Sequence, residues 1–418
     1  MRPWYKNLDW MTVLIWALLV CAGLTAIYSA THGPAREFLL LSVQRNFNRQ
    51  LMWFGVSAAV MLAIILTPAR FVFKISPLVY VITVGLLVAA LFFGREVNGA
   101  RSWLYIGPFG LQVSELAKVG TLLLVARMLS ANPAREGKWS YLMLAGATVM
   151  LPAVLIVLQN DAGTALVFLA LIPILLFWSG TVPLSWMALL VAPVVVGYLY
   201  IVNPLVAGFF ALVFSVGMMF VMRSKAFGGV AGLFSFGTLV MVYIALDKVL
   251  QPHQQARIRA FADPERYRLT EGFHVIQAKA AIGSGGFLGK GFTHGTQTQL
   301  AYIPEQSTDF IFCVIGEEFG FVGAMIILVL FGMLIIRVAT LGTAAGFAFP
   351  RLFAAGVTGI FLVHVVINVG MTIGLMPVIG IPLPLISYGG SALLANTAMI
   401  AIALNLHARR DELGIYTG

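Results

Sequence analysis

Long apolar segments separated by short polar ones run along almost the whole chain. A helix needs about 20 consecutive apolar residues to cross the hydrocarbon core of a bilayer. Segments of about that length predict spanning helices at 10–30, 50–67, 73–93, 113–131, 141–158, 162–179, 185–202, 206–222, 227–247, 308–336, 352–375 and 384–406. The pattern predicts an all-α, polytopic transmembrane bundle of about ten to twelve spans, twelve by the best count, in one membrane domain over 1–418.

The boundary at Asn203-Pro204 decides the count, because the polar interruption there is short. If 185–222 were one kinked helix, the chain would have eleven spans and the topology after it would be inverted. At the N-terminus, Arg2 and Lys6 precede an apolar segment from about Trp10 to Ala30. A secretory signal has an apolar segment of about 7–15 residues, so we interpret this longer one as a retained first span.

Composition supports the membrane assignment. Hydrophobic residues make up 60% of the chain and charged residues 10%, against about 45–50% and about 25% in a soluble domain. The net charge is +10, but the basic residues are scattered between apolar segments, which argues against nucleic-acid binding. The two cysteines, Cys21 and Cys313, lie far apart in apolar segments, so we expect neither a disulfide nor a cysteine metal site.

The basic residues orient the bundle, since short cytoplasmic loops carry an excess of Lys and Arg. With twelve spans and both ends in the cytoplasm, the inner side holds Arg2, Lys6, Arg70, Lys74, Arg127, Arg135, Lys138, Arg223, Lys225, Arg337, Arg351, Arg409 and Arg410. The short outer segments hold only Arg36, Arg45, Arg49, Arg95, Arg101 and Lys248. This orientation places a large loop, at about 251–307, outside the membrane.

Polar residues beside the first outer segments form two groups. The first group runs through 98–103 and 112–118, where Glu115 and Lys118 are three apart and share one helix face. The pair either serves insertion alone or belongs to a polar patch that opens to an outer cavity. The second group, 159–164, contains Asp161, which either caps the next helix or contributes to the same patch.

Two further groups follow in the C-terminal half. The third, 304–318, places Asp309 at the outer mouth of a span, where it either starts a helix or serves chemistry. At 100° per residue, Glu317 lies about 80° from Asp309 around a helix and Glu318 about 180° away, so Glu317 is the expected partner of the Asp309 face. The fourth, 382–391, predicts irregular backbone at membrane depth, which is tolerated only inside protein or beside a wet cavity.

One topology puts all four groups on the outer side, and convergent polar groups in one cleft are typical of a substrate site. Other signals are weaker. The glycine-rich segment 283–291 lacks the Gly and the Ser or Thr that a P-loop needs around Gly-Lys. His364 lies within a span, and we interpret it as a helix–helix contact rather than a metal ligand.

These segments together resemble the SEDS family of peptidoglycan glycosyltransferases over most of the chain. The two most specific segments are GFHVIQAKAAIGSGGFLGKGFTHGTQTQLAYIPEQSTDFIFCVIGEEFG, which ends at Gly320, and GIPLPLISYGGS, which ends at Ser391. The Gly-Ile-Pro-Leu-Pro motif resembles the rod-shape (RodA) branch of the family rather than the division (FtsW) branch. The family usually has ten spans, so the surplus pair is expected within 185–250.

The resemblance implies that the chain polymerises lipid II into glycan strands at the outer face of the bacterial cytoplasmic membrane during cell elongation. The family's essential aspartate falls on Asp309, and its polar pocket falls on Trp103, Glu115, Lys118, Glu317 and the Ser387 loop. The family usually works with a class B penicillin-binding protein, a transpeptidase, among other elongation-complex membrane proteins.

A mechanism follows as a hypothesis. Asp309 acts as the base for the acceptor hydroxyl, while Lys118, Arg101 or Arg49 neutralises the diphosphate of the donor. A divalent cation, Mg²⁺ or Mn²⁺, could share that task, although the sequence shows no dedicated metal cage. Two other classes compete: a flippase, which needs polar groups through the whole bilayer depth, and a non-catalytic scaffold, which needs no such constellation.

Overall fold

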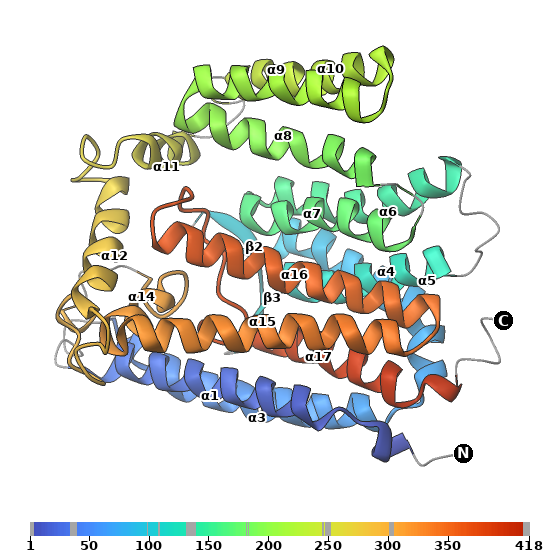
Figure 1. The fold of residues 1–418 in the computed structure, drawn as a ribbon. Coiled ribbons are helices and arrows are strands. Elements are labelled where there is room, and N and C mark those ends of the chain that lie inside the picture. The colour runs from blue at the N-terminus through green and yellow to red at the C-terminus, as the bar shows by residue number, and fades with distance from the viewer. Residues whose placement is uncertain are drawn as a thin grey trace. The chain divides into compact units, whose positions relative to one another are not determined.

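The computed structural model describes residues 4–33, 40–97, 99–107, 109–130, 139–180, 182, 184–244, 246, 252–300 and 305–412 (Figure 1). Over these residues the chain is almost entirely helical, which confirms the predicted all-α class. Asn98 of the first polar group, Pro304 of the third, and residues 251 and 301–304 of the predicted outer loop lie outside the described residues.

The described chain forms two compact units. The first comprises Met1–Ser179, Gln277–Leu375 and Ile379–Gly418, and the second comprises Gly180–Ile276 and Met376–Val378. Each is described by itself below, and the single domain expected over 1–418 stays a prediction.

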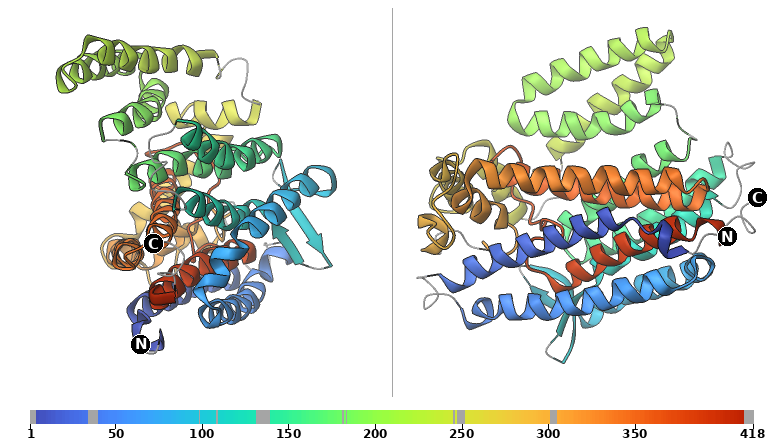
Figure 2. Two further views of the ribbon diagram at one scale, coloured as in Figure 1. Left: turned by 90° about the vertical axis from the view of Figure 1, so that its right-hand side faces the viewer. Right: turned by 60° about the horizontal axis from the view of Figure 1, so that its bottom comes forward.

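The first unit is a bundle of long helices whose axes run roughly alongside one another (Figures 1 and 2). They are α1 (Trp10–His32), α3 (Asn46–Leu66), α4 (Ala69–Phe93), α5 (Val113–Ser130), α6 (Trp139–Leu158), α7 (Ala162–Trp178), α15 (Gly320–Ala344), α16 (Ala348–Thr372) and α17 (Gly390–Ala408). The closest neighbours are α3 with α17, α4 with α5, α15 with α16, and α6 with α7. Short elements complete this unit: η1 (Trp4–Asn7), α2 (Leu41–Gln44), α13 (Thr296–Gln299), α14 (Ile311–Glu318) and η5 (Arg410–Glu412).

The most buried helices of this unit lie in its centre. In the most apolar stretch of each helix, 72% of the α16 residues and 78% of the α17 residues are buried, against 22% in α3 and 28% in α4. Helices that remain apolar where they are exposed must face lipid. The centre of the unit is therefore built by α16 and α17, with α5 also largely buried against them.

The second unit contains α8 (Leu184–Val202), α9 (Pro204–Val221), α10 (Lys225–Ile244) and α11 (Pro252–Ala262). Asn203 caps α9, since its Oδ1 accepts hydrogen bonds from the N–H groups of Leu205 (2.9 Å) and Val206 (3.4 Å), and Pro204 occupies the first turn. These are the ordinary signals of a helix start. The alternative of one kinked helix over 185–222 is therefore wrong.

A small core of Leu189, Met218 and Ala231 holds α8, α9 and α10 together. Outside it, α9 and α10 are the least buried of the eight described helices that are long and apolar enough to span a membrane. Three shorter apolar helices, Leu142–Leu158, Ala162–Trp178 and Trp186–Val202, add to these eight. The chain is thus a multi-pass membrane protein, while the count of twelve and the cytoplasmic position of both termini stay predictions.

Two spanning helices begin later than predicted. The segment predicted to span 308–336 is divided into α14 and α15 at Gly320, whose φ is +65°. The segment predicted over 384–406 becomes helical only at Gly390, after the irregular backbone that the sequence indicated. Both differences arise from glycine-containing turns that hydropathy does not detect.

A three-stranded antiparallel sheet connects α4 to α5, and the sequence had not indicated it. Its strands are β1 (Arg95–Val97), β2 (Ala100–Ile106) and β3 (Phe109–Gln112), in the order β1-β2-β3. In the register of β2 and β3, Trp103 pairs with Gln112. Because β3 leads directly into α5, the sheet fixes where Glu115 and Lys118 begin their helix.

Candidate active site

The segment around Asp309 is held by its backbone. The Asn368 side chain, on α16, donates a 2.9 Å hydrogen bond to the Asp309 carbonyl oxygen. On the other side, the Ser387 hydroxyl donates a 2.6 Å hydrogen bond to the Thr308 carbonyl oxygen. Asp309 itself is half-buried, just before α14 begins. The peptide units on both sides of Asp309 are thus fixed by side chains from other parts of the chain.

Ser387 organises the loop that follows α16. Its Oγ accepts a 2.8 Å hydrogen bond from the Leu383 N–H while donating to Thr308. The next residue, Tyr388, donates from its N–H to the Ser307 carbonyl oxygen at 2.8 Å. Leu385, with a φ of +65°, lies in the tight turn between Leu383 and Ser387. The third and fourth polar groups of the sequence therefore lie against each other, as their predicted common location requires.

The first turns of α3 support the same loop. Asn46 donates to the Ser307 hydroxyl at 3.2 Å. The amide of Gln50 donates to the Ser387 carbonyl oxygen at 3.4 Å and accepts from the Gly389 N–H at 3.1 Å. Arg49 lies between these two buried residues in sequence and is exposed. Arg49 therefore belongs to the same helix turn whose neighbouring residues hold the Ser387 loop.

Glu115 and Lys118 form an ion pair beneath this loop. The Lys118 Nζ lies 2.8 Å from Glu115, and both side chains are inaccessible to solvent, with exposures of 0% and 2%. The ammonium also lies 3.1 Å from the Nε2 of His364, on α16, whose Nδ1 lies 3.1 Å from the Pro382 carbonyl oxygen. The predicted pair exists, but Lys118 meets His364 rather than open space, and His364 in turn meets the Pro382 carbonyl oxygen.

Asp161 caps α7. Its carboxylate accepts hydrogen bonds from the N–H of Thr164 (3.0 Å) and from the hydroxyl of the same residue (2.9 Å). The Gln112 and Ser114 side chains each approach it at 3.4 Å. The capping interpretation is confirmed, and the second polar group meets the first through this carboxylate.

The sheet is fastened to the same region. The Gln112 N–H donates to the Ser391 hydroxyl, on the first turn of α17, at 2.9 Å. The Arg101 N–H donates to the Gln159 carbonyl oxygen at 2.9 Å, whereas its side chain pairs with Glu96 at 3.6 Å and is 61% exposed. Trp103 is half-buried on β2. Contacts therefore link all four polar groups within the first unit, although Arg101 points its charge towards solvent.

Glu317 has a different role from the one its helical angle predicted. Its carboxylate accepts hydrogen bonds from the N–H groups of Thr296 (2.7 Å), Gln297 (2.9 Å) and Thr298 (2.9 Å), and from the Lys290 ammonium at 2.9 Å. It thus caps the short helix α13. Burial would raise the pKa of Glu317, but these donors lower it to about 2. Through these bonds Glu317 organises 284–298, and its expected partnership with the Asp309 face stays a prediction.

Glu318 binds the first helix. Its Oε1 accepts hydrogen bonds from the Ser29 hydroxyl (2.5 Å) and from the Gln299 amide (2.8 Å). Burial outweighs these donors, so the pKa of Glu318 is raised above its ordinary value. The two adjacent glutamates therefore differ: Glu317 is held as a carboxylate and Glu318 is shifted towards the neutral acid.

The glycine-rich segment forms a clasp around the junction between α14 and α15, which we call the glycine clasp (residues 285–291). The N–H groups of Lys290 and Gly291 donate to the carbonyl oxygens of Glu317 and Glu318, each at 3.0 Å. In return, the Phe321 N–H donates to the Gly286 carbonyl oxygen at 2.9 Å. A Cβ at Gly289 would meet the Glu318 carbonyl. The segment rejected as a P-loop therefore has a structural use.

The sequence missed three amide side chains that hold these loops, Asn46, Gln50 and Asn368. The helix–helix contact expected of His364 is confirmed, since its ring on α16 lies 3.1 Å from Lys118 on α5. His364 and Asn368 are four apart on one face of an apolar helix, and that spacing is the only signal that could have linked them. Within the described residues, no group of three or more His, Cys, Asp or Glu side chains is placed to hold a metal ion. The divalent cation stays a prediction.

The comparisons with known proteins agree on one family. A family model described as a cell cycle protein, covering FtsW, RodA and SpoVE, matches residues 9–207 and 202–412. The peptidoglycan glycosyltransferase RodA of Treponema pallidum is 34% identical, covering 98% of this chain and 99% of that protein. The peptidoglycan glycosyltransferase MrdB of Escherichia coli K12 is also 34% identical, covering 96% and 94%.

Solved structures agree. A chain from a peptidoglycan synthase complex, described as coordinating polymerization and crosslinking, is similar with a TM-score of 0.72 and 30% identity, covering 96% of this chain and 98% of that one. The rod shape determining protein RodA of Thermus thermophilus is similar with a TM-score of 0.62 and 26% identity, covering 96% and 97%. The similarity extends over both units.

Proposed function

The chain belongs to the FtsW, RodA and SpoVE family, the SEDS family that its motifs resemble, and from that membership we propose that Asp309 is the base of its polymerisation reaction. The chain is a peptidoglycan glycosyltransferase of the RodA kind, an enzyme of cell elongation. Its substrate is lipid II, and it lengthens glycan strands at the outer face of the bacterial cytoplasmic membrane.

The observation that carries this proposal is the clamped backbone of Asp309. A base must lie within hydrogen-bond reach of the proton that it removes, so its position has to be fixed. The bonds from Asn368 to the Asp309 carbonyl and from Ser387 to the Thr308 carbonyl hold the backbone, and Asp309 as a residue is half-buried. A carboxylate on a fixed backbone can be held at one place beside a bound hydroxyl.

The reaction is a single displacement with inversion. The 4-hydroxyl of the acceptor GlcNAc attacks the anomeric carbon of the donor strand, and a β-glycosidic bond forms. The bond between that carbon and the α-linked diphosphate breaks, and the polyprenyl diphosphate leaves with the electron pair. The hydroxyl proton passes to Asp309. Positioned proton transfer of this kind contributes about 10²–10⁴-fold to a rate.

Arg49 is the better candidate for the charge of the leaving diphosphate. Lys118 is fully buried and already bound to Glu115 and His364, while Arg101 pairs with Glu96. Arg49 is exposed on the helix turn whose neighbour Gln50 holds the Ser387 loop. Substrate-binding roles for Arg101, Trp103, Glu115, Lys118, Asp161, Glu317 and Ser387 stay predictions, as does a part for Mg²⁺ or Mn²⁺.

The partner of this enzyme is proposed to be a class B penicillin-binding protein. Support comes from the similar chain that was solved within a peptidoglycan synthase complex whose description couples polymerization to crosslinking. A transpeptidase beside the polymerase would cross-link strands as they emerge. Further elongation-complex membrane proteins are expected in the same assembly.

A reconstituted polymerisation assay tests the proposal. Purified protein, with and without a transpeptidase partner, is supplied with labelled lipid II, and the products are separated on a gel. Asp309→Asn should abolish strand synthesis, whereas Asp263→Asn, an exposed acid that caps its own turn, should not. Strand synthesis by Asp309→Asn would remove the base role. Flipping of lipid II without any polymer would instead favour the flippase, and growth supported by an inactive variant would favour the scaffold.

A further inference from the structure

Two side chains on one face of α16 hold the loop beside Asp309. His364 is 2% exposed and Asn368 is fully buried. The Asn368 amide donates to the carbonyl oxygens of both Ile381 (2.8 Å) and Asp309 (2.9 Å). One turn earlier, the His364 ring lies between Lys118 and the Pro382 carbonyl oxygen. The helix thus reaches two successive loop carbonyls with two side chains.

The chemistry of the partners assigns the His364 protons. An ammonium can only donate hydrogen bonds, so Nε2 of His364 must accept from Lys118. Its Nδ1 therefore carries the hydrogen and donates to the Pro382 carbonyl oxygen. The bonds run in one direction, from Lys118 through the imidazole to the loop, and Glu115 fixes the ammonium at the start. Ser387, a few residues along the same loop, holds the Thr308 carbonyl.

We propose that His364 is a positioning residue for Asp309, which acts by orienting the loop at 381–387 through its Nδ1–H bond to Pro382. This inference rests on the proposed base role of Asp309. A histidine that merely filled a buried space would affect stability alone. A positioning residue must also affect the chemical step, since a displacement of about 1 Å can reduce a rate about 10²-fold.

Two amide variants separate the two bonds of the imidazole. In His364→Asn, the short side chain brings its amide near the place of Nδ1, so it can donate to Pro382 but does not reach Lys118. In His364→Gln, the longer side chain brings its amide near the place of Nε2, so it can accept from Lys118 but leaves Pro382 unbound. His364→Leu removes both bonds.

The experiment measures kcat and KM for lipid II, together with the melting temperature, for the four forms and for Asp309→Asn. We expect His364→Gln and His364→Leu to lower kcat about 10–100-fold with KM within about twofold, and His364→Asn to stay within about fivefold of the unchanged protein. Equal kcat for the Asn and Gln variants, or a change in KM alone, would overturn the inference. Activity in Asp309→Asn would instead overturn the base role, whatever the His364 variants do.

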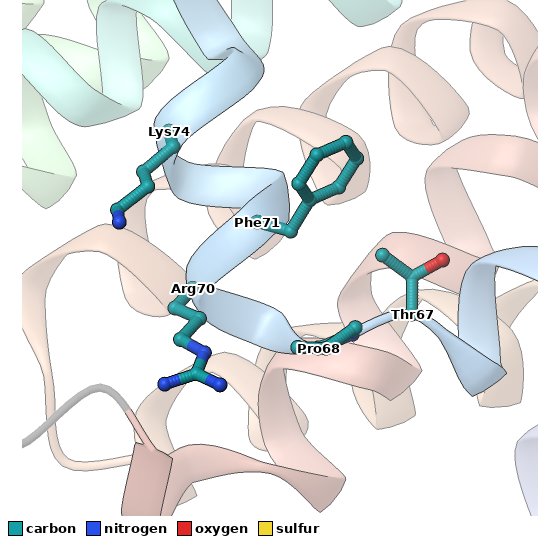
Figure 3. A pocket seen from close by; sticks show the side chains of 5 residues that line it. All are labelled: Thr67, Pro68, Arg70, Phe71 and Lys74. Atoms are coloured by element: carbon teal, nitrogen blue, oxygen red, sulfur yellow. The ribbon is translucent and has the colours of Figure 1, made fainter.

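A separate observation lies at the turn between α3 and α4. A pocket of about 410 Å³ is lined by Thr67, Pro68, Arg70, Phe71 and Lys74. Figure 3 shows the Arg70 and Lys74 side chains extending from one side of the first turns of α4 and the Phe71 ring from the other. The pocket therefore combines two cationic groups with apolar walls.

The turn between α3 and α4 is held by side-chain hydrogen bonds and is surrounded by basic residues. Asn405 donates to the carbonyl oxygens of Ile64 and Thr67, which fixes the end of α3. Arg127 donates to the Phe73 and Lys74 carbonyl oxygens and so adds a third cation nearby. Glu412 accepts a hydrogen bond from the first N–H of α4, and it is engaged by Arg409. Among the described residues named here, positive charge therefore exceeds negative charge.

We infer that this pocket binds the phosphodiester of an anionic phospholipid. One candidate span ends at Leu66 and the next begins at Ala69, so the pocket lies at the depth where lipid headgroups meet water. Basic residues near that surface attract anionic lipid headgroups. Arg70 and Lys74 would hold the phosphate, while Phe71 and Pro68 would cover the glycerol and upper acyl chain.

Native mass spectrometry of the detergent-purified protein with added phosphatidylglycerol or phosphatidylcholine tests this. Arg70→Gln with Lys74→Gln should lose phosphatidylglycerol binding at least fivefold, whereas the matched pair Arg223→Gln with Lys225→Gln, also exposed at a helix–helix turn, should not. Equal losses in both pairs, or equal binding of phosphatidylcholine, would overturn the assignment. Displacement of phosphatidylglycerol by millimolar inorganic phosphate would show that the pocket takes free phosphate instead.

Discussion

The ammonium of Lys118 lies 2.8 Å from the carboxylate of Glu115 in a place that solvent does not reach. Removing one member of such a pair leaves an uncompensated charge, which costs about 3–5 kcal/mol. We therefore expect Lys118→Met or Glu115→Gln to lower the melting temperature strongly. The exposed pair provides the control, because Arg101→Gln removes an interaction of about 0–1 kcal/mol with Glu96. Melting curves in detergent that moved equally in both cases would contradict this ranking.

The glycine clasp gives a second prediction. Gly289 has a φ of +81° and no room for a Cβ against Glu318, while Gly286 has a φ of +58° and nothing within 4 Å of its would-be Cβ. Gly286→Ala should therefore cost only backbone strain, about 1 kcal/mol. Gly289→Ala should cost more, since the backbone bonds that hold α14 must shift. Unfolding measurements on the two variants compare the costs, and equal costs would argue against the clasp.

Glu317 predicts a dependence of stability on acid. Its pKa falls from an ordinary 4.5 to about 2 in the folded chain, where the donors outweigh burial. A group with a lowered folded pKa stabilises above its unfolded pKa and loses that contribution as pH falls. The stability difference between the unchanged protein and Glu317→Gln should be full above about pH 4.5 and shrink towards pH 2. A difference that stayed constant over that range would contradict the assigned contacts.

Glu318 should behave in the opposite sense. Burial raises its pKa in the folded chain despite the bonds from Ser29 and Gln299. Folding therefore favours the neutral acid, and ionisation at higher pH weakens the protein. Glu318→Gln keeps a neutral side chain that can accept the same bonds, so its stability relative to the unchanged protein should rise with pH above 4.5. A relative stability that fell over the same range would show that the carboxylate is the favoured form.

The sequence predicted what depends on local spacing. Glu115 and Lys118, three apart, do form a pair, and Asp161 does cap α7. The irregular backbone before α17 also appears where its prolines and glycines indicated it. Each of these rests on neighbours within a few residues, where helix geometry and turn preferences decide the outcome.

What the sequence did not predict depends on contacts between distant residues. Helix α15 starts late, at Gly320, which packs closely against the backbone of Gly289. These two glycines are too far apart in sequence for a local hydropathy average to relate them. The bond from His364 to the Pro382 carbonyl depends on how a loop folds back onto α16. The helical angle between Asp309 and Glu317 does not apply, because Asp309 precedes α14, and the 296–298 backbone donates to the Glu317 carboxylate.

Arg49 supplies the last prediction. It is exposed beside Gln50, and diphosphate release needs a nearby cation that is not already neutralised by a carboxylate. Arg49→Gln should lower kcat/KM for lipid II about tenfold or more while leaving the melting temperature unchanged, because an exposed side chain contributes little to folding. Arg45→Gln is the matched control, since Arg45 is exposed one turn earlier, at the start of α3. If both variants lose activity equally, the effect is general attraction of an anionic substrate, and Arg49 has no particular place at the leaving group.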